Sequence, residues 1–157
     1  MRHRSRVGLA VLGLILGAGA ALPALSTAPG NAADNATVTV VVTNLRNTHG
    51  MVQACLTAAP GHFPDCDRDP ASHRLTVHAA ASTVLQFTDV PPGNYAVAVL
   101  HDENGNGRVD KVLMVPREGF GFSRDAPVRF GPPTFADAVF AMGHDAQRQT
   151  IRMRYML

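Results

Sequence analysis

The feature that most constrains the fold is a period of two in the apolar residues, repeated in short runs. In TVTVVVTNL, residues 37–45, Val38, Val40 and Val42 fall on one face of an extended chain, and threonines fall on the other. The same period recurs in MVQACLT, RLTVHA, STVLQFTDV and QTIRMRYM. Side chains alternate between the faces of a strand, and β-branched residues favour extended backbone. This pattern predicts an all-β fold.

The run NYAVAVL, residues 94–100, is apolar on both faces and follows the turn PPG. A strand that is apolar on both faces is typical of the centre of a sheet. After residue 33, only PTFADAVFAMGHDAQ shows a weak helical pattern, which predicts a short helix or an irregular strand. A further short strand is expected in PVRF, residues 127–130. The sum is an antiparallel, Ig-like β-sandwich of about seven strands.

The first 33 residues have the order of a secretory signal. MRHRSR carries three arginines, the uncharged run VGLAVLGLILGAGAALPAL follows, and small residues accumulate in STAPGNAADNA. We therefore expect a cleaved signal peptide over residues 1–33, a single domain over 34–157, and a periplasmic or secreted protein. The apolar run approaches the length of a membrane span, so an uncleaved anchor is the alternative. No second span follows.

The charge balance changes when the signal is removed. The whole chain has 14 Lys and Arg against 12 Asp and Glu, a formal net charge of +2. Residues 1–33 hold three arginines and no acid, so 11 − 12 leaves −1 for residues 34–157. This balance argues against nucleic acid or an anionic membrane as the partner of the mature chain.

Cys55 and Cys66 are the only cysteines. In an exported protein such a pair favours a disulfide, here across the Pro- and Asp-rich segment APGHFPDCDRDPASH. It would contribute about 2–3 kcal/mol by restricting the unfolded chain. Two buried thiols are the alternative, and the sequence has no CxxC spacing that would favour a redox or zinc site.

The polar stretch HDENGNGRVD, residues 101–110, follows the central strand directly. Its oxygen-bearing side chains recur at every second position, and Gly107 stands where a calcium loop needs a sharp bend. The residue after that glycine would contribute its backbone carbonyl. Hard oxygen ligands favour Ca²⁺ over zinc or copper. The expected metal ligands are Asp102, Asn104, Asn106, Arg108 through its carbonyl, Asp110 and Glu118.

The match to a calcium loop is incomplete. Leu113 occupies the twelfth position, where a bidentate Glu is usual, and Glu118 would have to fold back from beyond Pro116. We therefore expect weak binding, with a dissociation constant of about 10⁻⁴ to 10⁻³ M. The alternative is a hairpin turn that uses Asp, Asn and Gly because they tolerate positive φ. That alternative explains the composition but not the placement of oxygens at alternate positions.

Two blocks, DVPPGNYAVAVLHDENGNGRVD and VPREGFGFSRDAP, resemble the bacterial exported family DUF2141. The resemblance extends from TNLRNTHGMVQACL to IRMRYML. The PPGNY turn also resembles prealbumin-like and collagen-adhesin B-type sandwiches, which implies the same fold class. The family has no established activity, so the resemblance implies no reaction. This chain reads KVLMVP after the polar loop and is one residue shorter there than is common in the family. The resemblance therefore gives less support to the ligands expected in the second half of the loop.

The expected function is therefore that of an exported, non-catalytic binding or structural module, with an envelope protein or a glycan as its partner. Phe120 and Phe122 in EGFGFS would form a partner surface beside the cation loop, or they would be sandwich core. One alternative is a hydrolase of glycans or peptides that uses Asp110 and Glu118. Ser123 is a weak nucleophile candidate because it lacks a GxSxG context.

A second alternative is periplasmic copper binding. The histidines carry no HxH or HxxxH spacing, and methionines are more often core residues than ligands. The residues considered for it are His49, His62, His73, His78 and His144, with Met114, Met142, Met153 and Met156.

Overall fold

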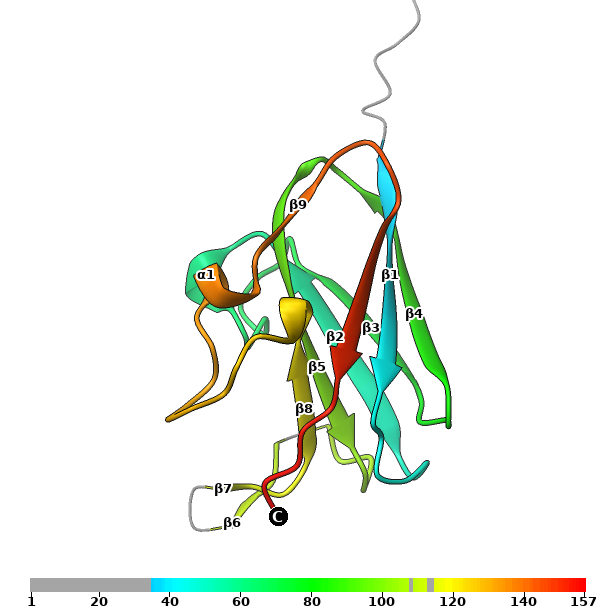
Figure 1. Cartoon of the computed structure of the whole chain (residues 1–157), viewed down its shortest axis with the longest axis vertical. Coiled ribbons are helices and arrows are strands. Elements are labelled where there is room, and N and C mark those ends of the chain that lie inside the picture. The colour runs from blue at the N-terminus through cyan, green and yellow to red at the C-terminus, as the bar shows by residue number, and fades with distance from the viewer. Residues whose placement is uncertain (1–34, 108, 113–114) are drawn as a thin grey trace, which may run out of the picture. The chain divides into compact units, whose positions relative to one another are not determined.

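The computed structural model describes residues 35–107, 109–112 and 115–157, and these form an almost entirely β structure (Figure 1). The predicted all-β class is confirmed. The predicted signal peptide, residues 1–33, lies outside the described residues. Within the described part of the chain, no helix is long and apolar enough to cross a membrane.

The smaller sheet has the strand order β10-β1-β4. β1 pairs antiparallel with β4 and parallel with β10, so the expectation of a wholly antiparallel sandwich is wrong at one pair. The chain enters β10 from β9, which pairs with the larger sheet, and not through a hairpin from β1. A connection that crosses between the sheets allows two strands to pair in parallel, whereas a tight hairpin does not. The strands are β1 (Ala36–Thr43), β4 (Thr83–Val90) and β10 (Gln147–Arg152).

The larger sheet has the order β3-β2-β5-β8, and β9 pairs with the start of β5. A separate hairpin, β6-β7, interrupts the connection between β5 and β8. The strands are β2 (Met51–Thr57), β3 (His73–His78), β5 (Gly93–Asp102), β6 (Lys111–Val112), β7 (Val115–Pro116), β8 (Gly119–Phe122) and β9 (Phe140–Met142).

The period of two places the core between the sheets. Val38 and Val40 of β1 are fully buried, and Leu85 of β4 is 1% exposed. β5 is buried on both faces: Val97 belongs to the main core, and Ala96 belongs to a second cluster on the opposite face. The prediction that NYAVAVL is a central strand is therefore confirmed.

The second cluster lies under two short helices, η2 (Ser123–Asp125) and α1 (Phe135–Ala138). The segment PTFADAVFAMGHDAQ, predicted to be a short helix or an irregular strand, forms both, because α1 is followed directly by the short strand β9. The strand expected at PVRF is absent: residues 127–130 are a loop, and the Phe130 side chain is fully exposed. Val128 packs against the second cluster, but Phe130 has no apolar contact, so the two apolar side chains of this segment do not share one buried face as a strand at a core would require.

The two cysteines form a disulfide, as expected, with their Cα atoms 6.4 Å apart. It joins β2 to the loop that leads through η1 (Pro60–His62) to β3.

Candidate functional site

The polar loop leaves the end of the central strand, at the lower edge of the larger sheet in Figure 1. β5 is hydrogen-bonded to β2 on one side and to β8 on the other. On the β8 side His101 stands opposite Gly119. One further step in this antiparallel register places Asp102 opposite Glu118, and directly opposed residues have side chains on the same face. The fold thus brings together two carboxylates sixteen positions apart.

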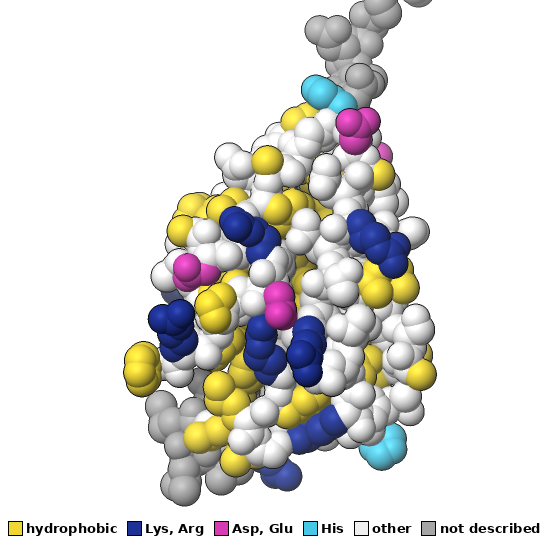
Figure 2. Space-filling model, in the orientation of Figure 1, with side chains coloured by type: hydrophobic (Ala, Val, Ile, Leu, Met, Phe, Trp, Pro, Cys, Tyr) yellow, Lys and Arg dark blue, Asp and Glu magenta, His cyan; other side chains and the backbone are white. Residues whose placement is uncertain are grey.

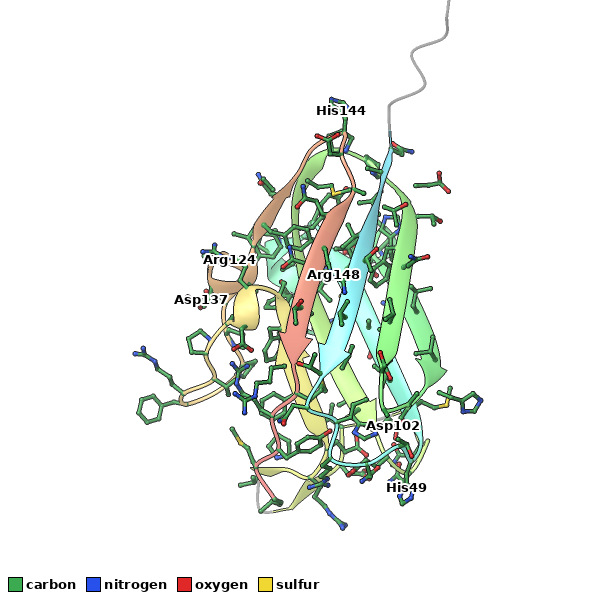
Figure 3. The ribbon with its side chains drawn as sticks, turned by 45° about the vertical axis from the view of Figure 1, so that its right-hand side comes forward. His49, Asp102, Arg124, Asp137, His144 and Arg148 are labelled. Carbon is green, nitrogen blue, oxygen red and sulfur yellow. A yellow bond between two sulfur atoms is a disulfide. The ribbon has the colours of Figure 1, made fainter. Side chains whose placement is uncertain are left out.

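Asp102 organises the first turn of the loop. It is fully buried, and Figure 3 shows it at the end of its strand. Its Oδ1 accepts a hydrogen bond from the Asn106 N–H at 3.2 Å, and its Oδ2 accepts one from the Gly107 N–H at 2.6 Å. The Gln53 amide donates to Oδ2 at 2.9 Å. Gly107 has φ +74°, a conformation that glycine adopts without strain.

The next three polar side chains converge on one another. The side-chain amides of Asn104 and Asn106 donate to Oδ2 of Asp110 at 2.7 and 3.0 Å. The Arg117 N–H donates to the Asp110 carbonyl at 2.9 Å, which closes the loop at its far side. Rotation of either amide about its terminal bond would present its oxygen instead of its nitrogen, so the same side chains can face an anion or a cation.

Glu118 is the unusual member of the group. Its side chain is buried, with 3% exposed, and among the described residues its Oε2 has no hydrogen-bond partner. Burial, together with the negative charges of Asp102 and Asp110, raises the pKa of this carboxyl to about 7, against a backbone hydrogen bond from Asp110 that lowers it. A buried oxygen without a donor is rare in proteins and costs free energy.

The metal ligands predicted from the sequence are therefore not all placed alike by the structure. Asp102, Asn104, Asn106 and Asp110 share hydrogen bonds within the loop, and the charges of Asp102 and Asp110 act on the buried carboxyl of Glu118. Arg108 lies outside the described residues. Within the described ranges, no three His, Cys, Asp or Glu side chains stand close enough together to hold a metal ion as they are. The loop gathers the oxygens without presenting a preformed coordination shell.

A second network, which the sequence did not predict, supports the base of the loop. Arg46 forms an ion pair with Glu103 and donates to the Arg117 carbonyl at 3.0 Å. Its guanidinium also lies over the Tyr155 ring, 4.6 Å from the centroid. The ion pair with Arg46 lowers the pKa of Glu103. Glu103 stands 57 positions from Arg46, so no local pattern could have revealed the pair.

His101 is fully buried, and both of its ring nitrogens are engaged. Nδ1 lies 2.8 Å from the Tyr155 hydroxyl, and Nε2 lies 2.9 Å from the His49 carbonyl. Beside it, Gly50 has φ +69°, and a Cβ there would stand 2.0 Å from the Asp102 carbonyl oxygen. His101 is thus a structural residue that fixes the end of β5, and it is not available for acid–base chemistry with Asp102.

The predicted partner surface needs correction at Phe122. Its side chain is only 5% exposed, and its ring packs edge to face against Phe63 with centroids 5.8 Å apart. Phe120 is half-buried against the same cluster. The rings alternate along β8 with Gly119 and Gly121, which lie close to Tyr155 and Ile151 where a side chain would clash, and so both rings face the second cluster. Phe122 therefore forms no apolar rim beside the loop.

Ser123 is also structural. It is fully buried, its Oγ donates to the Ala138 carbonyl at 2.6 Å, and it accepts from the Val97 N–H at 2.9 Å. Two of the methionines considered for copper, Met142 and Met153, belong to the main core, while Met114 lies outside the described residues.

The comparisons with known proteins agree with the family resemblance. Residues 40–150 match the model of a family described as an uncharacterized protein conserved in bacteria, DUF2141. No curated protein and no solved structure matches the chain. The match extends from within β1 to within β10 and includes the polar loop. On this evidence the chain belongs to the DUF2141 family.

Proposed function

We propose that this protein is an exported, non-catalytic binding or structural module whose 102–118 loop binds Ca²⁺ weakly. The observation that carries the proposal is the buried Glu118 Oε2, which has no partner among the described residues and lies in the field of two other carboxylates. A divalent cation would supply the missing partner and offset the mutual repulsion of the three acids.

The donor set favours calcium. Asp102, Asp110 and Glu118 contribute carboxylates, and the two asparagines contribute amide oxygens after rotation. All of these are hard oxygen donors, and Ca²⁺ accepts six to eight of them in flexible geometry. The Asp102 oxygens already hold the loop's backbone N–H groups. Coordination by Asp102 would therefore compete with hydrogen bonds that its oxygens already accept, which is consistent with weak affinity.

The two alternatives have less support. A hydrolase that uses Asp110 and Glu118 needs both carboxyls open to substrate, but Glu118 is 3% exposed. A copper site needs free nitrogen or sulfur ligands. Of the residues considered for it, Met142 and Met153 are buried in the main core.

The experiment is a thermal melt of the mature chain in 10 mM Ca²⁺ and in chelator. For dissociation constants of 10⁻⁴ to 10⁻³ M, calcium should stabilise the fold by about 1.4–2.7 kcal/mol, a rise in Tm of about 4–10 °C. Glu118→Gln should abolish this rise and leave the metal-free Tm equal or slightly higher, because it removes a buried charge without changing the shape. Asp145→Asn, at an exposed carboxylate in another turn, is the matched control.

A calcium-induced rise that persists in Glu118→Gln would contradict the assignment of Glu118 as a ligand. An unchanged melt of the parent protein in 10 mM Ca²⁺ would contradict the calcium site itself. Substitution of Asp110 by Asn separates these results further, since it too should remove the calcium response while the disulfide and both sheets stay intact.

A further inference from the structure

A second polar surface lies away from the calcium loop, on the outer face of β10. Arg148 and Arg152 project from this strand on its exposed side, and Arg154 follows in the same alternation. Figure 2 shows the Lys and Arg side chains gathered over β10 and the neighbouring η2, with few acidic side chains among them. At about 3.3 Å per residue the three arginines span about 20 Å. They form a row of positive charge along one strand.

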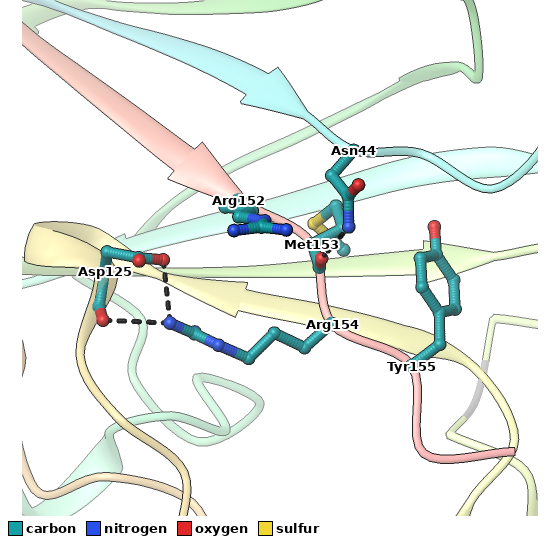
Figure 4. A pocket seen from close by; sticks show the side chains of 6 residues that line it. All are labelled: Asn44, Asp125, Arg152, Met153, Arg154 and Tyr155. Atoms are coloured by element: carbon teal, nitrogen blue, oxygen red, sulfur yellow. Dashed lines mark hydrogen bonds and ion pairs between the residues drawn. The ribbon is translucent and has the colours of Figure 1, made fainter.

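The row ends in a pocket of about 490 Å³ (Figure 4). Arg154 is fixed there: it forms an ion pair with Asp125 at 2.8 Å and donates to the carbonyls of Asp125 and Ala126 at 3.0 and 3.3 Å. Arg152 extends over the same pocket and makes no ion pair or hydrogen bond with a described residue. Its guanidinium therefore has its donors directed to solvent, beside an arginine that is already held in place.

Besides Met153 and Tyr155, the remaining lining contains Asn44 and Asp125, whose polar groups suit hydroxyls. Asn44 is anchored through its amide, which donates to the Met153 carbonyl at 2.8 Å. Along the sheet, threonines of β1 flank the arginines: Thr39 stands opposite Arg148, and Thr43 stands opposite Arg152. The Asp125 carboxylate is half exposed at 51% and can accept hydrogen bonds beside its ion pair.

From this arrangement we infer that the outer face of β10 and its pocket bind an acidic glycan, a sugar chain that carries carboxylate or sulfate groups. Arg148 and Arg152 would take the anionic groups in bidentate pairs, Arg154 would add positive charge from its fixed position, and the threonines, Asn44 and Asp125 would take the hydroxyls. Tyr155 is the one aromatic residue that lines this pocket, and Arg46 already lies over its ring, which leaves no face there on which a nucleic-acid base could stack. The surface thus favours a glycan over single-stranded nucleic acid.

This site is independent of the calcium loop, so the two proposals can fail separately. The test measures binding of oligogalacturonate and of a heparin oligosaccharide to the mature chain by calorimetry at low and at physiological salt. We expect binding that weakens with salt, because charge pairs on an exposed surface are screened. Arg152→Gln should weaken binding about tenfold, and Arg152→Lys less, because lysine keeps the charge but loses the planar fork.

Two controls make the result specific. Arg68→Gln removes an exposed arginine from the loop between β2 and β3 and should leave glycan affinity unchanged. The Tm of Arg152→Gln without ligand should equal that of the parent, which shows that the variant is folded. Absence of binding to either acidic glycan, or equal affinity of Arg152→Gln and parent, would overturn the inference. Equal or tighter binding of a single-stranded oligonucleotide or of oligoglutamate would overturn the assignment to a glycan.

Discussion

Two loops of this protein each bury a carboxylate, and they do so in opposite ways. Asp69, in the disulfide loop between β2 and β3, is 7% exposed, and Glu118, in the polar loop after β5, is 3% exposed. Asp69 Oδ2 accepts from the Thr57 hydroxyl at 2.5 Å, and Oδ1 accepts from the Ala71 N–H at 3.0 Å. These hydrogen bonds lower the pKa of Asp69, whereas burial and neighbouring acids raise that of Glu118.

The difference separates a structural carboxylate from a candidate ligand. Around Asp69 the chain supplies a donor for each oxygen, so the ionised group stabilises its own loop. Around Glu118 the nearest charges are other acids, and one oxygen has no donor among the described residues. Two carboxylates with similar burial can therefore have different roles, one structural and one as a candidate ligand. The hydrogen-bond partners of their oxygens distinguish the two roles.

The largest expected effect comes from removing the Cys55–Cys66 disulfide, which joins β2 to the loop between β2 and β3. Replacement of both cysteines by serine, Cys55→Ser with Cys66→Ser, should lower the free energy of unfolding by about 2–3 kcal/mol, because the unfolded chain regains the freedom that the cross-link removes. Urea denaturation measures this loss. The calcium response should persist in this variant, since Cys55 pairs with Ala98 in the middle of β5, four residues before the polar loop begins at Asp102. Loss of that response would show that the two loops depend on each other.

The next effect concerns pH in the absence of calcium. Between about 4.5 and about 7 the folded protein holds a proton on Glu118 that the unfolded chain has released. The folded state binds more protons in this window, so stability should fall as pH rises through it, by about 1–3 kcal/mol. Urea denaturation at pH 5 and pH 7.5 measures the slope. Glu118→Gln should remove this contribution, and a slope that is unchanged in the variant would assign it to other groups.

The sequence predicted most of the fold because the signal is local. The alternation in residues 37–43 and the apolar run of β5 follow directly from the burial of one face or of both. The parallel pairing of β10 with β1 was not predictable, because it depends on which sheet the chain enters after β9. PVRF failed as a strand since its aromatic residue has no core to pack against.

The candidate site was predicted only in part, because its local pattern is visible in the sequence and its contacts between distant segments are not. The spacing of Asp102, Asn104 and Asn106 is a local pattern, and it identified the loop. That Glu118 would be buried without a donor depends on the register of β8 against β5, which no spacing reveals. The Arg46–Glu103 ion pair and the arginine row of β10 likewise arise from contacts between distant segments.

The most direct test is an NMR titration of the side-chain carboxyl carbons of Glu118 and Asp69 in the mature protein, with and without calcium. The account predicts that Glu118 titrates near pH 7 in chelator and well below that in calcium, while Asp69 titrates below its ordinary range in both conditions. A Glu118 carboxyl that titrates near 4.5 in chelator, with no change on addition of calcium, would contradict the account.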